Sequence, residues 1–329
     1  MDHSKLLRAR ARLALYREAQ SWVFDPNITM VDFGWYQNDE GLVEGDYRIR
    51  FHVRQKFEEG PQLESAIDEG QTSGEIPEHI GPFKRNVIES GYELQRWWLS
   101  WWRPRQQEQR ALRADPLRGG ISIGNEYAYD YGTLGALVVD RDTGKVMCLS
   151  NWHVLVKYWT ARRGQRIYQP GRRDGGTSAD TVASLERHAM SVNLDAAVAK
   201  LTNARSLTND QLDIGAITGV QQPELGMNVV KSGRGSKITY GRISGIEGIS
   251  EPISYSGTER RIFHMITIDQ RASHEEVSRG GDSGSIWIDA DSKQAIGLHF
   301  AGYNQPERAL AMNIVNVLNA LNVDLYLLS

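Results

Sequence analysis

The stretch Arg279-Gly280-Gly281-Asp282-Ser283-Gly284-Ser285 places a serine between glycines, directly before the β-rich run Ile286-Trp287-Ile288. An attacking serine needs its hydroxyl on a tight turn, with backbone N–H groups that can point at a developing oxyanion. Glycine permits such a turn because it adopts backbone angles that other residues avoid. The same glycines also suit an ordinary turn between two strands, so this stretch alone leaves both interpretations open.

Two residues upstream would complete a nucleophilic site. A serine needs a general base, and histidine has the unperturbed pKa best suited to that task near neutral pH. His153 comes just after the apolar run at residues 146–149, where the end of a strand would project it into a cleft. Asp195 lies in an otherwise apolar segment, where a charge is costly unless it is paired. Each residue alone also has a structural interpretation, as a packed or surface histidine and as a turn-capping aspartate.

From residue 119 onward, short strands recur with hairpin signals between them. The paired runs are residues 132–140 with 145–151, 227–231 with 237–246, and 285–288 with 294–301. Many short strands, Gly-rich turns and few helical periods indicate a β-barrel or sandwich. Residues 313–321 are the exception, because their apolar positions form a helical stripe, so we expect a C-terminal helix.

The order of the three candidates is His153, Asp195, Ser283, with spacings of 42 and 88 residues. This order and these spacings are close to those of one serine-hydrolase template, whereas the other templates run in different orders. Three individually ambiguous signals agree within a β-rich region, and together they predict a Ser-His-Asp triad.

Residues 119–329 resemble chymotrypsin/trypsin-like serine peptidases. The motif Ser-Asn-Trp-His ends at His153, Leu-Asp-Ala-Ala-Val contains Asp195, and Gly-Asp-Ser-Gly-Ser contains Ser283. A closer similarity is to bacterial intracellular trypsin-like peptidases, a group that includes the plant narrow-leaf protein. It rests on residues 47–56, 132–135, 149–155, 169–171 and 231–234.

The resemblance implies a mainly β fold with two six-stranded antiparallel barrels that divide near residue 225, and with the triad in the cleft between them. Ser283 would be the nucleophile, His153 the general base and then acid, and Asp195 its orienting carboxylate. The N–H groups of Gly281 and Ser283 would form the oxyanion hole.

The resemblance also bears on activation. In secreted relatives, cleavage frees an amino terminus that pairs with the aspartate before the nucleophile, here Asp282. Residues 118–122 (Arg-Gly-Gly-Ile-Ser) lie where that cleavage would fall but lack the usual arginine-isoleucine junction. We therefore expect Asp282 to be satisfied within the chain and the full-length chain to be active. Two positions depart from the family: Asn151 replaces the usual alanine, and Cys148 has no partner for the common disulfide.

The residues expected in the specificity pocket do not indicate a single substrate preference. Val277 occupies the position where trypsin-like enzymes carry an aspartate, which argues against a preference for Lys or Arg. Gly302 ends the strand expected beside the substrate, and His299 falls where glutamate-specific relatives place a histidine that binds the substrate carboxylate. The pocket could then prefer an acidic residue, with Ser278 or Arg279 assisting. Alternatively, His299 packs under the barrel and the pocket takes small apolar residues.

Residues 1–115 are expected to form a small α+β module with a linker, followed by the peptidase domain at residues 116–329. Residues 4–23 have a helical pattern, and residues 29–36 and 46–54 alternate as half-buried strands do. A loop-rich excursion follows at residues 58–82.

Four tryptophans form the module's most unusual feature. They would share one side of a helix, which suits partner docking, an interfacial membrane contact or simple packing onto the neighbouring domain. These residues are Trp97, Trp98, Trp101 and Trp102.

Composition narrows the class of protein. The chain has 329 residues, of which 40% are hydrophobic and 24% charged, as in ordinary globular proteins. A net charge of −3 gives no reason to expect nucleic acid or a membrane as an electrostatic partner. No apolar run is long enough for a membrane span. Cys148 is the only cysteine, so no intrachain disulfide can form, and we expect a cytoplasmic location.

The predicted function is a serine endopeptidase that acts on proteins or peptides without a metal or cofactor. Its first 115 residues would recruit substrate or regulate access. Two alternatives remain: a catalytically silent peptide-binding scaffold on the same fold, and an esterase with the same triad. The physiological substrate is not predicted, and homo-oligomerisation is left open.

Overall fold

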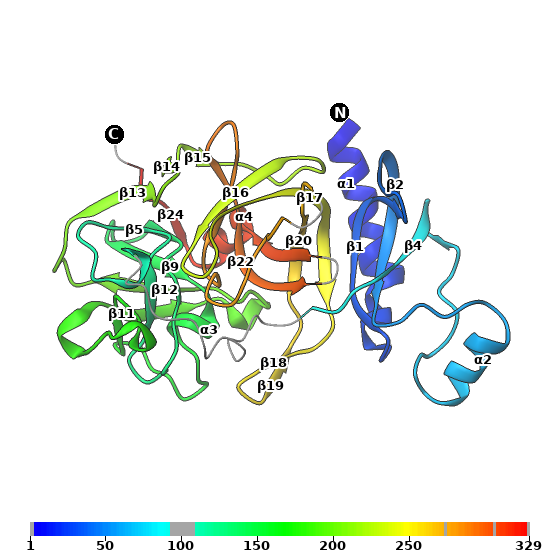
Figure 1. Cartoon of the computed structure of the whole chain (residues 1–329), viewed down its shortest axis with the longest axis horizontal. Coiled ribbons are helices and arrows are strands. Elements are labelled where there is room, and N and C mark those ends of the chain that lie inside the picture. Colours follow the sequence, from blue (N-terminus) through cyan, green and yellow to red (C-terminus); the bar gives the residue numbers. More distant parts are fainter. Residues whose placement is uncertain (1–2, 93–108, 273–274, 305–306, 328–329) are drawn as a thin grey trace.

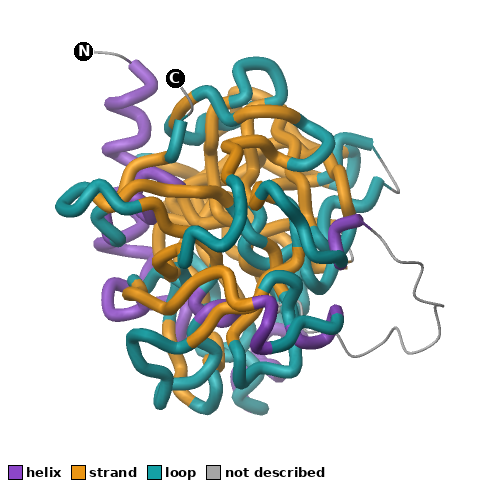
Figure 2. Tube along the Cα trace, turned by 90° about the vertical axis from the view of Figure 1, so that its left-hand side faces the viewer, coloured by secondary structure: helices purple, strands orange, loops and turns teal. Residues whose placement is uncertain are grey.

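The computed structural model describes residues 3–92, 109–272, 275–304 and 307–327. It is mainly β, with few helices, and confirms the fold class expected from the sequence. A closed barrel occupies the middle of Figure 1, an open sheet lies at one end, and the N-terminal hairpin with helix α1 (His3–Ala14) lies at the other. Strands dominate the trace in Figure 2, where the helix next to the N-terminus lies on the outside.

The N-terminal module begins with a helix and a long hairpin, as expected. Helix α1 continues through a π-helical turn (Leu15–Ala19) and a 3-10 turn (Gln20–Phe24), and ends before Pro26. The hairpin consists of β1 (Ile28–Asn38) and β2 (Gly41–Val53). After it come α2 (Pro61–Asp68), β3 (His79–Ile80) and β4 (Phe83–Glu89), and β4 runs parallel to β2.

The first part of the expected peptidase domain is an open eight-stranded sheet, or half-barrel, in the order β24-β8-β9-β12-β11-β10-β6-β7. Its strands are β6 (Ser122–Asn125), β7 (Gly132–Thr133), β8 (Ala136–Asp140), β9 (Val146–Ser150), β10 (Arg166–Tyr168), β11 (Thr181–His188), β12 (Ala197–Leu201) and β24 (Val323–Leu325). A small sheet beside it contains β5 (Leu117–Gly119), β13 (Leu207–Gln211) and β14 (Gly215–Ala216). The short helix α3 (Trp152–Leu155) follows β9 directly.

The second part is a closed six-stranded barrel in the order β16-β21-β22-β23-β20-β17, closed by pairing of β16 with β17. Its strands are β16 (Asn228–Gly233), β17 (Lys237–Ser250), β20 (Phe263–Asp269), β21 (Ile286–Asp289), β22 (Gln294–Asn304) and β23 (Glu307–Asn313). Outside the barrel are β15 (Gly219–Val220) and the hairpin of β18 (Ile253–Tyr255) with β19 (Thr258–Arg260). The expected C-terminal helix is α4 (Ile314–Ala320), and the Asn313 side chain caps it by accepting a hydrogen bond from the Val315 N–H.

The N-terminal hairpin extends the barrel sheet, because β1 pairs antiparallel with β17 over residues 30–34. Buried side chains from α1, β1 and β2 pack in one cluster with barrel residues such as Trp287 and Ile296. The domain boundary expected near residue 115 and the division near 225 stay predictions. The four tryptophans of the docking prediction lie outside the described residues.

Candidate active site

His153 and Asp195 are brought together from neighbouring strands of the half-barrel. His153 lies in α3, immediately after β9, and Asp195 lies just before β12, which pairs with β9. His153 Nδ1 is 2.5 Å from Asp195 Oδ2, and the backbone N–H of His153 donates to Oδ1 at 3.1 Å. Asp195 is completely buried. The carboxylate therefore fixes the ring orientation, which leaves Nε2 as the nitrogen directed elsewhere.

Asn151, one of the two departures from the pattern of the peptidases that the sequence resembles, ties these two segments together. Its side-chain amide donates to the backbone carbonyl of Asp195 at 2.7 Å. Both residues are buried, so the bond satisfies two polar groups that solvent cannot reach. The sequence marked Asn151 as unusual, but only the strand pairing shows what the side chain does.

The segment at residues 277–285, called the serine loop here, is fastened to the same region of the half-barrel. The Thr133 N–H donates to the Ser283 carbonyl, and the Thr133 hydroxyl donates to the Gly281 carbonyl, each at 2.8 Å. Ser150, three residues before His153, donates in turn to the Thr133 carbonyl at 2.7 Å.

The side chain of Ser283, the third residue of the sequence-predicted triad, is buried. Ser283 is 4% exposed. The side-chain hydrogen bond given for His153 runs to Asp195, and within the described part of the chain none joins the imidazole to Ser283. Such contacts often tighten only when substrate binds. The Ser283–His153 contact therefore stays a prediction.

Gly281 has a backbone conformation that suits an oxyanion hole. Its φ is +99°, and a Cβ at this position would lie 2.4 Å from the Tyr131 ring, so a side chain is excluded for two reasons. In the part of the chain that the structure describes, the N–H groups of Gly281 and Ser283 donate to no backbone or side-chain acceptor. Both groups are available to an incoming ligand, as the predicted oxyanion hole requires.

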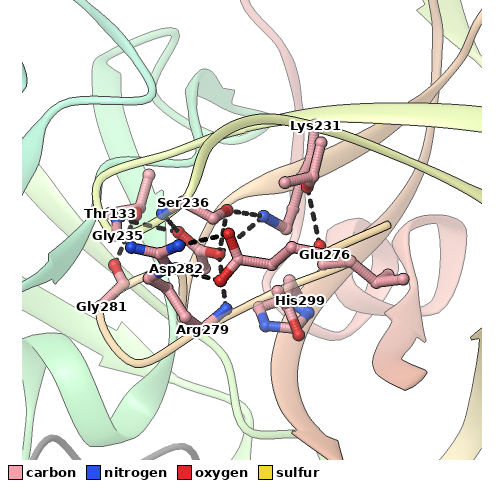
Figure 3. Close-up of polar contacts among 12 residues, drawn as sticks. Thr133, Lys231, Gly235, Ser236, Glu276, Arg279, Gly281, Asp282 and His299 are labelled. Carbon is pink, nitrogen blue, oxygen red and sulfur yellow. Dashed lines mark hydrogen bonds and ion pairs between the residues drawn. The ribbon is translucent and has the colours of Figure 1, made fainter. Parts of the chain in front are cut away.

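Asp282 is satisfied inside the chain, which confirms the expectation from the sequence (Figure 3). Its Oδ2 lies 2.7 Å from the ammonium of Lys231, and both side chains are fully buried. Backbone N–H groups of Gly235 and Ser236 donate to Oδ1, each at 2.9 Å, and that of Arg279 donates to Oδ2 at 3.0 Å. Burial would raise the pKa of Asp282, but the charge of Lys231 and the hydrogen bonds from Lys231 and Ser236 act together with other nearby groups to lower the pKa to about 2.

The residues predicted for the specificity pocket lie in different environments. Val277 is fully buried in a hydrophobic cluster, Ser278 is 2% exposed, and Gly302 pairs with Ala309 within β22 and β23. The Arg279 guanidinium bonds to the Glu276 carboxylate.

His299 is fully buried, with the Trp287 indole N–H donating to its Nδ1 at 3.4 Å. Burial and the nearby charge of Lys231 lower the pKa of His299 to about 3, so its ring is neutral near pH 7.

Glu307 was missed by the sequence reasoning. Its Oε1 accepts the backbone N–H groups of Val277 at 3.0 Å and Ser278 at 3.1 Å. Burial raises the pKa of Glu307 above its ordinary value. A polar hairpin residue gives no sequence signal of this role, because the contact depends on how β23 lies against the serine loop.

Among the described residues, no group of three or more His, Cys, Asp and Glu side chains is arranged to hold a metal ion. Within the same ranges, no helix combines the length and the apolar character needed to cross a membrane.

Comparison with known proteins finds similarity to solved protease structures. No family model matches the chain, and no curated protein matches it in sequence. Similar structures include Thermobifida fusca Protease A, with 16% identity over 64% of this chain and 98% of that chain, at a TM-score of 0.45. A glutamic acid specific serine protease that utilizes a histidine triad in substrate binding has 18% identity over 64% and 100%, at 0.47. Cellulomonas bogoriensis chymotrypsin has 16% identity over 64% and 99%, at 0.45. The narrower resemblance to the intracellular peptidase group stays a prediction.

Proposed function

We propose that this chain is a serine endopeptidase with Ser283 as nucleophile, His153 as general base and Asp195 as the carboxylate that orients it. The observation that carries the proposal is the buried Asp195 bonded to both the ring and the backbone of His153. The serine loop, bound to the same part of the half-barrel through Thr133, supports it.

The roles proposed for the two ring nitrogens of His153 follow from the hydrogen bond that one of them already makes. His153 Nδ1 is bonded to Asp195, so Nε2 would take the proton of Ser283 as its oxygen attacks a carbonyl, and later return it to the leaving amine. The negative charge that develops on the carbonyl oxygen would be met by the N–H groups of Gly281 and Ser283. Loss of one such donor costs roughly 10²–10³ in rate in related chemistry.

A fluorophosphonate probe and a peptide library test this proposal directly. Wild-type protein is expected to label covalently and to cleave peptides, whereas Ser283→Ala loses labelling and at least roughly 10⁴ in turnover. Folded protein that neither labels nor cleaves would favour the silent scaffold. Turnover of esters without peptides would favour the esterase.

The finer proposal concerns the residue on the amino side of the scissile bond. A preference for an acidic residue would need the neutral, buried ring of His299 to reach the substrate. Glu307 offers a competing carboxylate beside Val277 and Ser278, which would favour a basic residue instead. A fluorogenic panel with Glu, Asp, Lys, Arg and Ala at that position separates the two. His299→Ala should abolish an acidic preference, and Glu307→Gln a basic one.

A further inference from the structure

A tyrosine from the hairpin of β18 and β19, which lies between two barrel strands in the sequence, reaches the buried pair of His153 and Asp195 in the half-barrel. Tyr255 ends β18, in the hairpin inserted between β17 and β20, and it is 1% exposed. Its hydroxyl donates to Asp195 Oδ2 at 3.2 Å, on the same oxygen that His153 Nδ1 contacts. The hairpin is labelled β18 and β19 in Figure 1. The candidate site thus receives side chains from both halves of the fold in addition to the serine loop.

The hairpin is held against the segment around His153 by several contacts. The Tyr255 ring packs edge-on against Trp152, with centroids 5.8 Å apart, and the Trp159 indole N–H donates to the Tyr255 carbonyl at 2.6 Å. The Ser256 hydroxyl donates to the Lys157 carbonyl at 2.6 Å. These contacts hold the ring and the backbone of Tyr255, so the position of the hydroxyl is set by packing as well as by its own hydrogen bond.

The hydroxyl fills a gap in the hydrogen bonding of Asp195. A buried carboxylate has room for several donors and is costly when they are lacking. Among the described residues, the donors to this carboxylate are the backbone N–H and Nδ1 of His153 and the hydroxyl of Tyr255. Burial and the charge of Asp195 raise the pKa of Tyr255 well above its ordinary value, so the hydroxyl stays a donor across the working pH range.

We propose that Tyr255 is a positioning residue that holds Asp195 in place and moderates its pull on the His153 proton. This inference rests on the proposed function, in which His153 acts as base. Without the hydroxyl, the carboxylate would hold the imidazolium more strongly, so the imidazolium would lose its proton only at higher pH. A more strongly held proton and a less fixed ring would lower kcat roughly tenfold, with KM little changed.

The test variant is Tyr255→Phe, which keeps the ring against Trp152 and removes only the hydroxyl. The His153 imidazole is titrated by NMR in protein labelled with ¹⁵N-histidine, and the pH profile of fluorophosphonate labelling is measured alongside. The midpoint of the His153 titration and the midpoint of the labelling profile should shift to higher pH by the same amount. Tyr158→Phe is the matched control, because it makes the same change on a 42% exposed ring in the neighbouring segment. His188, which packs on Trp152, and His299, which interacts electrostatically with His153, are followed as separate resonances.

An unchanged His153 titration in folded Tyr255→Phe overturns the inference, as does an equal shift in Tyr158→Phe. If Tyr255→Phe fails to fold, 3-fluorotyrosine at position 255 replaces it. Its stronger donor should move the His153 pKa downward, and no shift would count against the inference. Wild-type protein that never labels would contradict the proposed function instead, while the NMR titration would still decide the role of Tyr255.

Discussion

Asp282 lies directly before Ser283, and its environment shows how the serine loop is ordered. In secreted members of the peptidase family that the sequence resembles, the resemblance implies that a new amino terminus created by cleavage pairs with the corresponding aspartate. Here the Lys231 ammonium, from β16, lies 2.7 Å from Oδ2 in a fully buried pair. A cation built into the barrel therefore neutralises the aspartate without cleavage, which is the physical basis for expecting an active full-length chain.

Lys231→Met tests this at the residue scale. The variant keeps much of the volume but leaves Asp282 as a buried charge without its cation, and this typically costs about 3–5 kcal/mol. We expect a large drop in melting temperature and loss of fluorophosphonate labelling, with Lys231→Arg retaining more of both. Lys200→Met, on an exposed side chain, is the control. A Lys231→Met protein that melts and labels like the wild type would show that the loop is ordered by other contacts.

At the scale of elements, the N-terminal hairpin and the barrel share a buried polar cluster. Asp32 on β1 forms an ion pair with Arg50 on β2, with Oδ2 and Nη2 2.5 Å apart and both side chains fully buried. Thr267 on β20 donates to the same Asp32 oxygen at 2.6 Å. Gly245 on β17 makes room for the pair, because a Cβ there would lie 2.0 Å from both partners. The hairpin is thus bonded into the barrel as well as added to its edge.

Arg50→Met should therefore destabilise the barrel as well as the hairpin. Removal of one partner of a buried pair leaves the other unpaired, and we expect a loss of about 3–5 kcal/mol in one cooperative transition, followed by denaturant unfolding. Arg48→Met on the same strand removes a partly exposed pair with Asp46 and a cation–π contact with Tyr36, and should cost about 1 kcal/mol. Two separate transitions, with only the first one shifted in Arg50→Met, would mean that the hairpin folds independently of the barrel.

At the scale of the whole molecule, buried histidines make stability depend on pH. Burial lowers the pKa of His52 to about 4 and that of His299 to about 3, so both are neutral in the folded chain. An unfolded histidine takes up a proton near pH 6.5, and the folded one does so only at lower pH. Their contribution to stability is therefore complete above pH 6.5 and is lost as pH falls toward 4 and 3. Asp32 and Asp282, whose pKa values are lowered by Arg50 and Lys231 against the effect of burial, add a further loss below about pH 4.

The melting temperature should consequently fall steadily below pH 6.5. Each buried histidine contributes a slope of about 1.4 kcal/mol per pH unit in that window. His52→Gln should show a shallower slope between pH 6 and 4.5, whereas His79→Gln, on an exposed residue, should keep the wild-type slope. A melting temperature that is flat from pH 6.5 to 4.5 would contradict this assignment.

Local patterns in the sequence were enough to predict the strands and the candidate catalytic residues. Alternation along residues 46–54 and the hairpin signals around residues 132–151 are local, since side-chain direction in a strand depends on near neighbours. His153 and Asp195 were found from their position beside apolar runs, and the structure brings them together.

The distant groups that complete the site could be identified only once the chain was folded. Four long-range contacts have no local sequence pattern. They are Lys231 with Asp282, Tyr255 with Asp195, Glu307 with the serine loop, and β1 with β17. Each depends on which backbone segments end side by side once the barrel closes. A buried charge must find its partner there, because water cannot reach it.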